Sequence, residues 1–311
     1  MKSWIKQEKQ MLNIKRALRS DRLMKALTGQ TMAEFKRLLP NFSAGLKKTQ
    51  AKARKERKRA MGGGRRHTLE TPTDKLFFIL FYLKCYPTFD LAGLLYGVDR
   101  SQAQRWVKAL LPVLETVLGW QAVLPQRRIR SIEEFIQHFP AVKDVFVDGT
   151  ERLVQRPQQA KAQRELYSGK QHEHTLKNLV LSDEDRHILC LTKTRPGARQ
   201  DYYRFKQTGL GEVIPDNVWV WVDLGFVGIV KDYPRLQVMI PYKSSKNHPL
   251  TPEQKAENQV ISTFRIRVEH TIAGIKRFRC LTDAYRNKGS ILADKFMLIA
   301  CGLWNYHLSP A

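Results

Sequence analysis

The chain has 311 residues, with 54 Lys and Arg against 29 Asp and Glu, and a formal net charge of +25 at pH 7. A chain of this length can hold two domains, at roughly one domain per 100–200 residues. So large a positive charge predicts a polyanionic partner such as nucleic acid. Four cysteines without a Cys-x-x-Cys pair argue against a disulfide framework or a zinc ribbon, and no signal peptide or basic amphipathic membrane helix is evident.

The charge is concentrated in residues 1–66, which contain 20 Lys and Arg but only 4 Asp and Glu. We predict that this region is a basic N-terminal arm and linker, in which residues 47–66 form a glycine-broken, solvated segment. The segment is either a disordered tether or a contact to the DNA backbone. We favour the backbone contact, because the segment precedes a candidate DNA-binding domain and each neutralised phosphate releases a counterion.

Residues 67–122 have the pattern of a helix-turn-helix DNA-binding domain. Thr71-Pro72 opens a helix over 76–86, Pro87 stops it, and a short helix follows over 89–96. Gly97 supplies a tight turn, and Asp99 is a plausible N-cap for a third helix.

Polar and basic side chains on one face of that third helix would point outward, toward base edges in a major groove and toward phosphates. The alternative is an ordinary helical bundle with a polar face, and the overall charge favours DNA. The outward residues are Arg100, Ser101, Gln102, Gln104, Arg105 and Lys108.

Residues 123–311 alternate between β-type runs and helical patterns. The apolar run over 219–223 suits a strand that is buried on both faces. The order of elements predicts an α/β fold with an RNase H-like core, a mixed central sheet with flanking helices. Strands are expected over 142–148, 152–155, 175–181, 186–192, 219–223 and 235–242, and helices near 199–206 and over 252–278.

Three carboxylates in this region are candidates for catalysis. Asp148 and Asp223 each close a strongly apolar run, and Glu269 lies on the long helix. One carboxylate at the end of each of two strands and one on a later helix can hold a pair of Mg²⁺ ions, which prefer oxygen ligands. Two such ions about 3.5–4 Å apart promote phosphoryl transfer. The pattern indicates a nuclease-type enzyme acting on DNA.

Arg265, Glu269 and Lys276 fall within about 40° of one another on the long helix, at 100° per residue. The alternative explanation is a row of ion pairs in which Arg265 merely neutralises Glu269. That explanation does not account for the two aspartates at the strand ends.

These motifs together resemble those of DDE-superfamily transposases of the bacterial insertion-sequence type, which are related to Harbinger-like transposases. The resemblance covers residues 76–308. In the related signature a tyrosine stands three residues before the arginine, where this chain has Ser262. The matching motifs are Asp148-Gly-Thr-Glu151, Tyr167-Ser-Gly-Lys170 leading into His174-Thr-Leu-Lys-Asn178, Val222-Asp223-Leu-Gly225, and Arg265-x3-Glu269-x6-Lys276.

The resemblance implies that Asp148, Asp223 and Glu269 are the catalytic residues and the ligands of two Mg²⁺ ions, for which Mn²⁺ would substitute. Arg265 and Lys276 would contact DNA phosphate near the cut, and Lys170 is a weaker candidate for such a contact.

The implied function is that of a transposase, which binds the terminal inverted repeats of a mobile element and catalyses DNA cleavage and strand transfer. Its partners would be double-stranded DNA, at the element ends and the target, and further copies of the chain in a homodimer or higher oligomer. We expect no membrane partner and a location in the bacterial cytoplasm, at the nucleoid when DNA is bound. The alternatives are a transposase-derived DNA-binding protein without catalysis and an RNase H-like DNA nuclease without strand transfer.

Several other residues attract attention. Glu151, three residues after Asp148, is an alternative fourth metal ligand, but we expect it to lie past the turn at the strand end and to point elsewhere. Trp219 and Trp221 are interpreted as packing residues.

Overall fold

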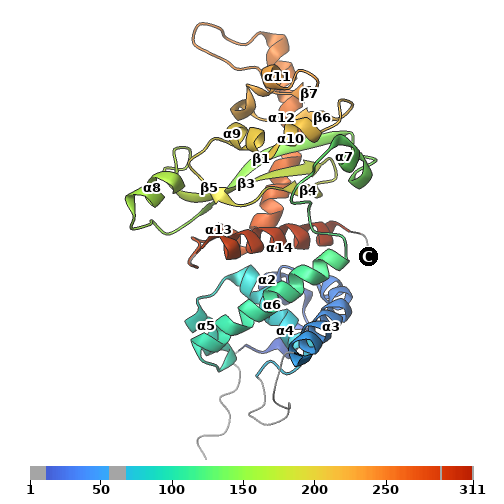
Figure 1. Ribbon diagram of the computed structural model, residues 1–311, viewed down its shortest axis with the longest axis vertical. Coiled ribbons are helices and arrows are strands. Elements are labelled where there is room, and N and C mark those ends of the chain that lie inside the picture. The colour runs from blue at the N-terminus through green and yellow to red at the C-terminus, as the bar shows by residue number, and fades with distance from the viewer. Residues whose placement is uncertain (1–11, 56–67, 288, 310–311) are drawn as a thin grey trace, which may run out of the picture. The chain divides into compact units, whose positions relative to one another are not determined.

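The computed structural model describes residues 12–55, 68–287 and 289–309, and divides into two compact units (Figure 1). The helical unit comprises the described part of Met1–Val123 together with Arg277–Cys280 and Ser309. The sheet unit comprises Leu124–Lys276 and Leu281–Leu308. No helix in the described part of the chain is both long and apolar enough to span a bilayer.

The helical unit begins with α1 (Ile14–Ala17), α2 (Asp21–Thr28) and α3 (Met32–Lys55). Phe35 and Phe42 of α3 are almost completely buried, and α3 packs against the later helices of the same unit. These helices therefore contribute to a hydrophobic core.

Part of the predicted linker is helical. We expected residues 47–66 to be a solvated, glycine-broken segment, but α3 continues without interruption through Lys55. Residues 47–51 are exposed, as expected of a solvated segment, but the expectation of a linker is wrong for residues 47–55, because this stretch extends a helix whose preceding turns are anchored in the core. Residues 56–66 lie outside the described part of the chain.

The predicted helix-turn-helix elements follow as α4 (Pro72–Cys85), α5 (Phe89–Tyr96) and α6 (Arg100–Trp120). Thr71 caps α4 in a reciprocal capping box with Asp74, in which each side chain accepts a hydrogen bond from the other's backbone N–H. Local signals in the sequence thus set where this helix begins.

The turn between α5 and α6 depends on two glycines. Gly97 adopts a left-handed conformation with φ of 62°, which glycine tolerates without steric strain. A Cβ atom on Gly93 would lie only 2.6 Å from the carbonyl oxygen of Val98, so the chain can fold back closely only if this residue is glycine. Asp99 then caps α6 by accepting a hydrogen bond from the Ser101 N–H at 3.0 Å.

Aromatic packing fixes α6 against α4 and α5. The ring of Phe78 meets the rings of Tyr96 and Trp106 edge to face, with centroids 5.1 and 5.2 Å apart. Ala103 and Val107 of α6 are buried. One face of α6 is therefore core and the other is available to a partner.

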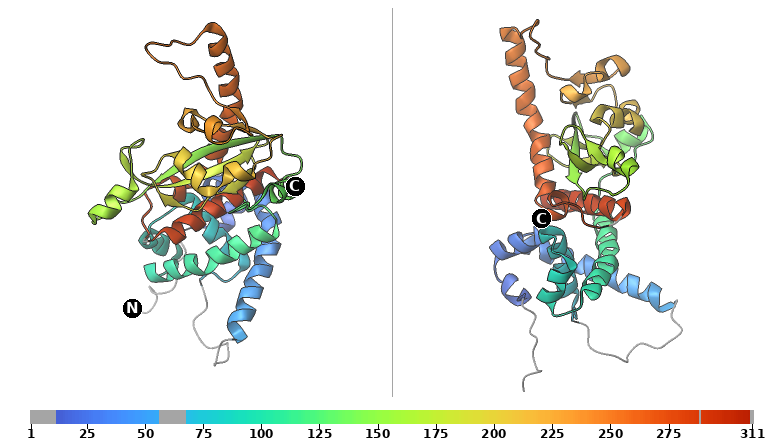
Figure 2. Two further views of the ribbon diagram at one scale, coloured as in Figure 1. Left: turned by 45° about the horizontal axis from the view of Figure 1, so that its top comes forward. Right: turned by 90° about the vertical axis from the view of Figure 1, so that its left-hand side faces the viewer.

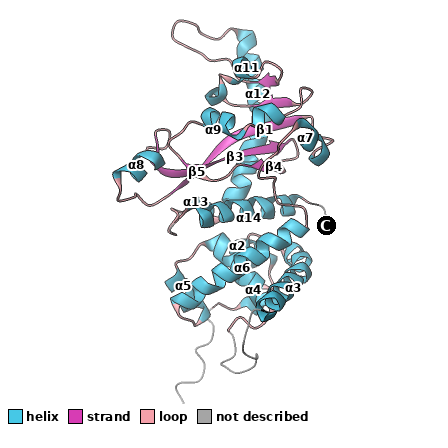
Figure 3. Ribbon diagram, viewed as in Figure 1, coloured by secondary structure: helices cyan, strands magenta, loops and turns pink. Residues whose placement is uncertain are grey.

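The sheet unit is built on a mixed sheet with the strand order β2-β3-β1-β6-β7, to which β4 and β5 add by pairing with β3. β1 pairs antiparallel with β3 and parallel with β6, and β6 pairs parallel with β7. This is the predicted fold class, a mixed sheet with flanking helices (Figure 3). The strands are β1 (Asp144–Leu153), β2 (Tyr167–Ser168), β3 (Glu173–Asp183), β4 (Ile188–Leu191), β5 (Arg195–Pro196), β6 (Trp219–Trp221) and β7 (Gln237–Met239).

Helices and hydrophobic clusters cover both faces of the sheet. Val145 and Val147 of β1 belong to the larger cluster, which also includes Phe205 of α9. Phe146 points to the other face and packs in a smaller cluster with residues of α12, which runs along one side of the unit (Figure 2). The helices are α7 (Ile132–His138), α8 (Ala160–Leu166), α9 (Asp201–Thr208), α10 (Leu210–Val213), η1 (Leu224–Phe226), α11 (Ile229–Asp232), α12 (Pro252–Lys276), α13 (Arg279–Thr282) and α14 (Ser290–Leu308).

Two details of the sheet differ from the prediction. β1 is one continuous strand over Asp144–Leu153, whereas we expected a strand that ends at Asp148 and resumes after a turn. The long antiparallel partner β3 keeps β1 extended beyond the apolar run that ends at Val147, as far as Leu153. Of the two tryptophans interpreted as packing residues, Trp221 is buried and stacks on Phe264 at 4.6 Å, but Trp219 is 40% exposed.

Candidate active site

The sheet register places Asp148 and Asp223 at matching positions. Phe146 of β1 pairs with Trp221 of the parallel neighbour β6, and each aspartate follows its member of this pair by two residues. Because strand side chains alternate between faces, Asp148 points to the same side of the sheet as Phe146, toward α12. Asp223 lies just beyond the end of β6. There it caps η1 and accepts a hydrogen bond from the Gly225 N–H at 2.9 Å.

The carboxyl group of Asp148 is poorly solvated and close to other acids. Burial raises its pKa to about 6, and repulsion from Asp223 and Asp201 adds to this effect. The Gly149 N–H, which donates to Oδ1 at 2.7 Å, and the guanidinium of Arg265 act in the opposite direction. Asp148 therefore sits where a further positive charge would favour its ionised form.

Glu269 projects from α12 and lines, together with Asp148, a cavity of about 520 Å³. Its side chain is exposed and makes no ion pair within 4.0 Å among the described residues. Arg265 pairs with Asp148 instead, with 4.0 Å between Nη2 and Oδ2. The alternative in which Arg265 merely neutralises Glu269 is therefore wrong.

The three carboxylates are oxygen donors of the kind that Mg²⁺ prefers. Asp148 and Asp223 are close enough to repel each other, and Asp148 shares its cavity with Glu269. Within residues 12–55, 68–287 and 289–309, however, no three Asp, Glu, His or Cys side chains converge closely enough to form a closed metal-binding group. The donor chemistry fits a divalent cation, and of the three carboxylates Asp148 and Glu269 line the cavity whereas Asp223 does not.

Two of the predicted DNA-contacting lysines lie at this cavity. Lys276, at the end of α12, is half-buried, and burial lowers its pKa while Asp148 and Glu151 act to raise it. Lys170 is exposed in the turn between β2 and β3 and lines the same cavity. Two lysines that are distant in sequence therefore place positive charge beside Asp148, in keeping with a phosphate ligand.

An internal ion-pair network, which sequence reasoning missed, supports the site from the side. The ammonium group of Lys177 lies 3.1 Å from Glu151 Oε1 and 3.0 Å from Asp201 Oδ1, and all three side chains are largely buried. Glu151 also accepts a hydrogen bond from the hydroxyl of Thr175 at 2.6 Å. Glu151 lines the cavity but its carboxylate is already engaged.

Gly149 allows Asp201 to approach β1. A Cβ atom at this position would overlap the Asp201 carboxylate, so only glycine leaves room for it beside Asp148. The glycine that follows Asp148 was a signal in the sequence for a close approach. No local pattern marked Asp201, because it lies on the first turn of α9, more than fifty residues further along the chain.

The remaining predicted DNA-contacting residues lie on the first turns of α6, in the helical unit. Arg100, Gln104, Arg105 and Lys108 are exposed, and Gln102 is half-buried. Arg100 lies 3.8 Å from Asp90 in a solvent-exposed pair, which water screens strongly. These side chains are available to a partner.

Comparisons with known proteins agree with this geometry. A family model described as DDE superfamily endonuclease matches residues 147–305, and a second, described as the helix-turn-helix of DDE superfamily endonuclease, matches residues 67–119. A probable transposase for insertion sequence element IS702 of Microchaete diplosiphon is 30% identical over 237 residues, which cover 76% of this chain and 80% of the relative. No solved structure matches the chain.

Proposed function

Since the chain belongs to the DDE superfamily of insertion-sequence transposases, we propose that it binds the terminal inverted repeats of a mobile element and catalyses metal-dependent DNA cleavage and strand transfer. The observation that carries the proposal is that Asp148 of β1 and Asp223, just beyond the end of β6, each follow by two residues the paired Phe146 and Trp221 of these parallel strands. Glu269 faces the same cavity as Asp148 from α12. This is a set of carboxylates suited to phosphoryl transfer.

Asp148, Asp223 and Glu269 would hold the divalent cations, two Mg²⁺ ions for which Mn²⁺ substitutes. When bound, such ions supply the positive charge that activates water at neutral pH and stabilises the leaving oxygen of a phosphodiester. The raised pKa of Asp148 supports this role, because a cation relieves the repulsion between Asp148 and Asp223.

Basic residues around the cavity would bind and orient the DNA strand. Lys170 and Lys276 supply ammonium groups for the phosphates that flank the scissile bond. Arg265 would hold the Asp148 carboxylate in place through their ion pair and would face the phosphate from α12. The DNA backbone would therefore bind on the face of the sheet to which the Asp148 side chain points.

The helix-turn-helix would supply the specificity for the element ends. Arg and Gln side chains at the start of a helix can read base edges in the major groove, and Lys binds phosphate. Because two element ends must react together, the active species would be a dimer or a higher oligomer, and it would act on DNA in the bacterial cytoplasm. The residues are Arg100, Gln102, Gln104, Arg105 and Lys108.

The direct test is cleavage of a labelled duplex that carries the element end, with Mg²⁺ or Mn²⁺. Wild type should nick the duplex at the element boundary. Asp148→Asn and Glu269→Gln should bind the duplex but fail to cut it. Glu253→Gln is a matched control, because Glu253 is an exposed carboxylate in the first turn of the same helix, α12. Tight binding without cleavage by wild type would contradict the catalytic part and favour a DNA-binding protein derived from a transposase.

A further inference from the structure

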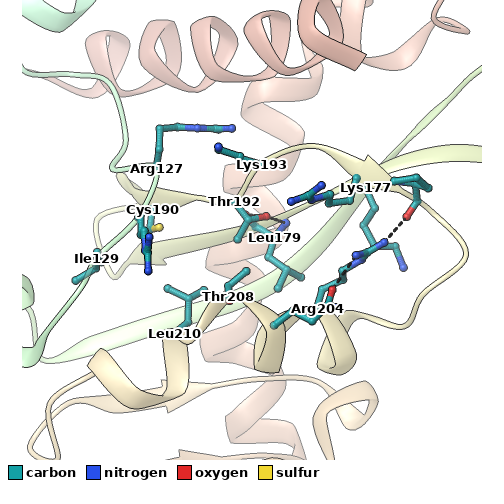
Figure 4. Close-up of a pocket in the computed structure, with 14 residues that line it drawn as sticks. Arg127, Ile129, Lys177, Leu179, Cys190, Thr192, Lys193, Arg204, Thr208 and Leu210 are labelled. Carbon is teal, nitrogen blue, oxygen red and sulfur yellow. Dashed lines mark hydrogen bonds between the residues drawn. The ribbon is translucent and has the colours of Figure 1, made fainter. Parts of the chain in front are cut away.

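A second cavity in the sheet unit has a volume of about 660 Å³ and is lined by six Lys and Arg side chains and no acidic one. Leu179 and Leu210, which also line it, belong to the hydrophobic cluster on the sheet face opposite α12. In Figure 4 Arg127 and Lys193 lie toward one end of the cavity, and Thr208 and Leu210 toward the other. The cationic residues are Arg127, Arg128, Lys177, Lys193, Arg195 and Arg204.

Two of these six cations are neutralised from within the protein. Arg127 donates to both oxygens of Asp294 at 2.7 Å, and Lys177 is held by Glu151 and Asp201. Those ion pairs fix the two side chains structurally.

Four cations remain without compensation. In the part of the chain that the structure describes, no ion pair within 4.0 Å includes any of them. Three are exposed at the rim and one is half-buried within the cavity. They are Arg128, Lys193, Arg195 and Arg204.

Two buried donors also lack acceptors. Neither Nη1 of Arg127 nor Nε of Arg204 has a hydrogen-bond partner among the described residues, although both atoms are buried. Burial lowers the pKa of Arg204, and repulsion from Arg195 adds to it. A buried donor without an acceptor is destabilising, more so when it is charged, so the oxygens of a bound anion would supply the missing acceptors.

We propose that this cavity binds the sugar–phosphate backbone of a DNA strand, as a site separate from the Asp148 cavity. The proposal rests on the proposed function in that DNA is taken as the substrate. Four uncompensated cations exceed the charge of one phosphate, which is about −1.5 to −2 for a monoester, whereas one strand presents several phosphates in succession. Ile129, Leu179 and Leu210 give the cavity an apolar wall against which a deoxyribose can pack.

The test is the salt dependence of DNA binding by the full chain, measured with a fluorescent duplex in EDTA so that no cleavage is needed. The variants are Arg128→Gln, Lys193→Gln and Arg195→Gln, each at an exposed position where folding is not threatened. Lys161→Gln is the matched control, because Lys161 is an exposed lysine of the same unit, on α8, that does not line the cavity.

In each cavity variant, the plot of the logarithm of the DNA association constant against the logarithm of salt concentration should become shallower, its negative slope shrinking by about one. Binding should weaken several-fold near physiological salt. The control should leave the slope unchanged. An unchanged slope in all three cavity variants, or an equal fall in Lys161→Gln, would overturn the proposal. Stabilisation of wild type but not of Arg195→Gln by inorganic phosphate, with unaltered DNA binding, would also overturn it by assigning the cavity to a free anion.

Failure of the cavity proposal can be told apart from failure of the proposed catalytic function. Loss of slope in the cavity variants of a protein that never cleaves would support the cavity and contradict catalysis. Cleavage at the element boundary by a protein whose cavity variants keep the wild-type slope would support catalysis and overturn the cavity.

Discussion

Arg265 of α12 and Asp148 of β1 form an ion pair in which 4.0 Å separates Nη2 from Oδ2, and both side chains are only about one-sixth exposed. The positive charge of Arg265 does not bring the pKa of Asp148 back to its ordinary value. Burial raises the pKa of Asp148 to about 6, and Asp223 and Asp201 raise it further than Arg265 can lower it. The site is therefore short of positive charge when no cation is bound, and this shortage has measurable consequences.

Asp148→Asn should stabilise the cation-free protein at high pH. Because the folded-state pKa of Asp148 lies above the ordinary value of 3.8, ionising this group destabilises the fold, beginning above about pH 4 and in full above about pH 6. A shift of about two units corresponds to roughly 3 kcal/mol. Urea unfolding in EDTA should show that the free energy of unfolding of the variant rises relative to that of wild type between pH 4 and pH 8. A difference that does not change with pH would contradict the raised pKa.

Divalent cations should stabilise wild type more than Asp148→Asn. A cation that binds the folded protein alone stabilises it by mass action, and it also relieves the repulsion at Asp148. The measurement is the shift in melting temperature at pH 8 on addition of Mg²⁺, and then of Mn²⁺. Equal shifts in wild type and in Asp148→Asn would mean that the cations bind elsewhere.

Gly149→Ala should destabilise the sheet unit by about 1–3 kcal/mol, because the new methyl group overlaps the carboxylate of Asp201. Gly169→Ala is the matched control. A Cβ atom there meets nothing within 4 Å, and its φ is not in the left-handed region. Denaturant unfolding should separate the two variants. Equal stability of the two would show that Asp201 moves away from Gly149 without penalty.

Lys177→Met should be strongly destabilising, by about 3–5 kcal/mol, since it leaves the carboxylates of Glu151 and Asp201 buried without their shared cation. Lys193→Met removes the same charge from an exposed position and should change stability by less than about 0.5 kcal/mol. Unfolding free energies at pH 7 provide the comparison. A small effect at Lys177 would mean that the two acids become protonated or reach solvent.

Gln104→Ala and Lys108→Gln should affect DNA binding differently. A glutamine that contacts a base edge contributes discrimination, so its loss should weaken binding to the element end by about 1–3 kcal/mol and spare random duplex. Loss of a lysine that contacts phosphate should weaken binding to the element end and to random duplex equally. Thr116→Ala, further along the exposed side of α6, is the control. Equal losses on both duplexes for Gln104→Ala would remove this residue from base recognition.

The sequence by itself determined the elements that are specified locally. The helix-turn-helix boundaries follow from the conformational freedom of Gly97 and from the capping side chains of Thr71 and Asp99, which act within a few residues. The start of α12 at Pro252 likewise matches the start of the helix predicted over 252–278. The apolar runs that precede Asp148 and Asp223, the position of Glu269 on the long helix and the family motifs all single out the same three candidate carboxylates.

Only the tertiary structure decided which of these residues meet. Asp148 lies within a strand because β3 pairs beside it, and Arg265 pairs with Asp148 across the fold. Lys177, Glu151 and Asp201 come from three different elements and become neighbours by sheet pairing and by the docking of α9. Periodicity reports which face of an element is buried and carries no information about what lies opposite, so such contacts between distant segments require the folded chain.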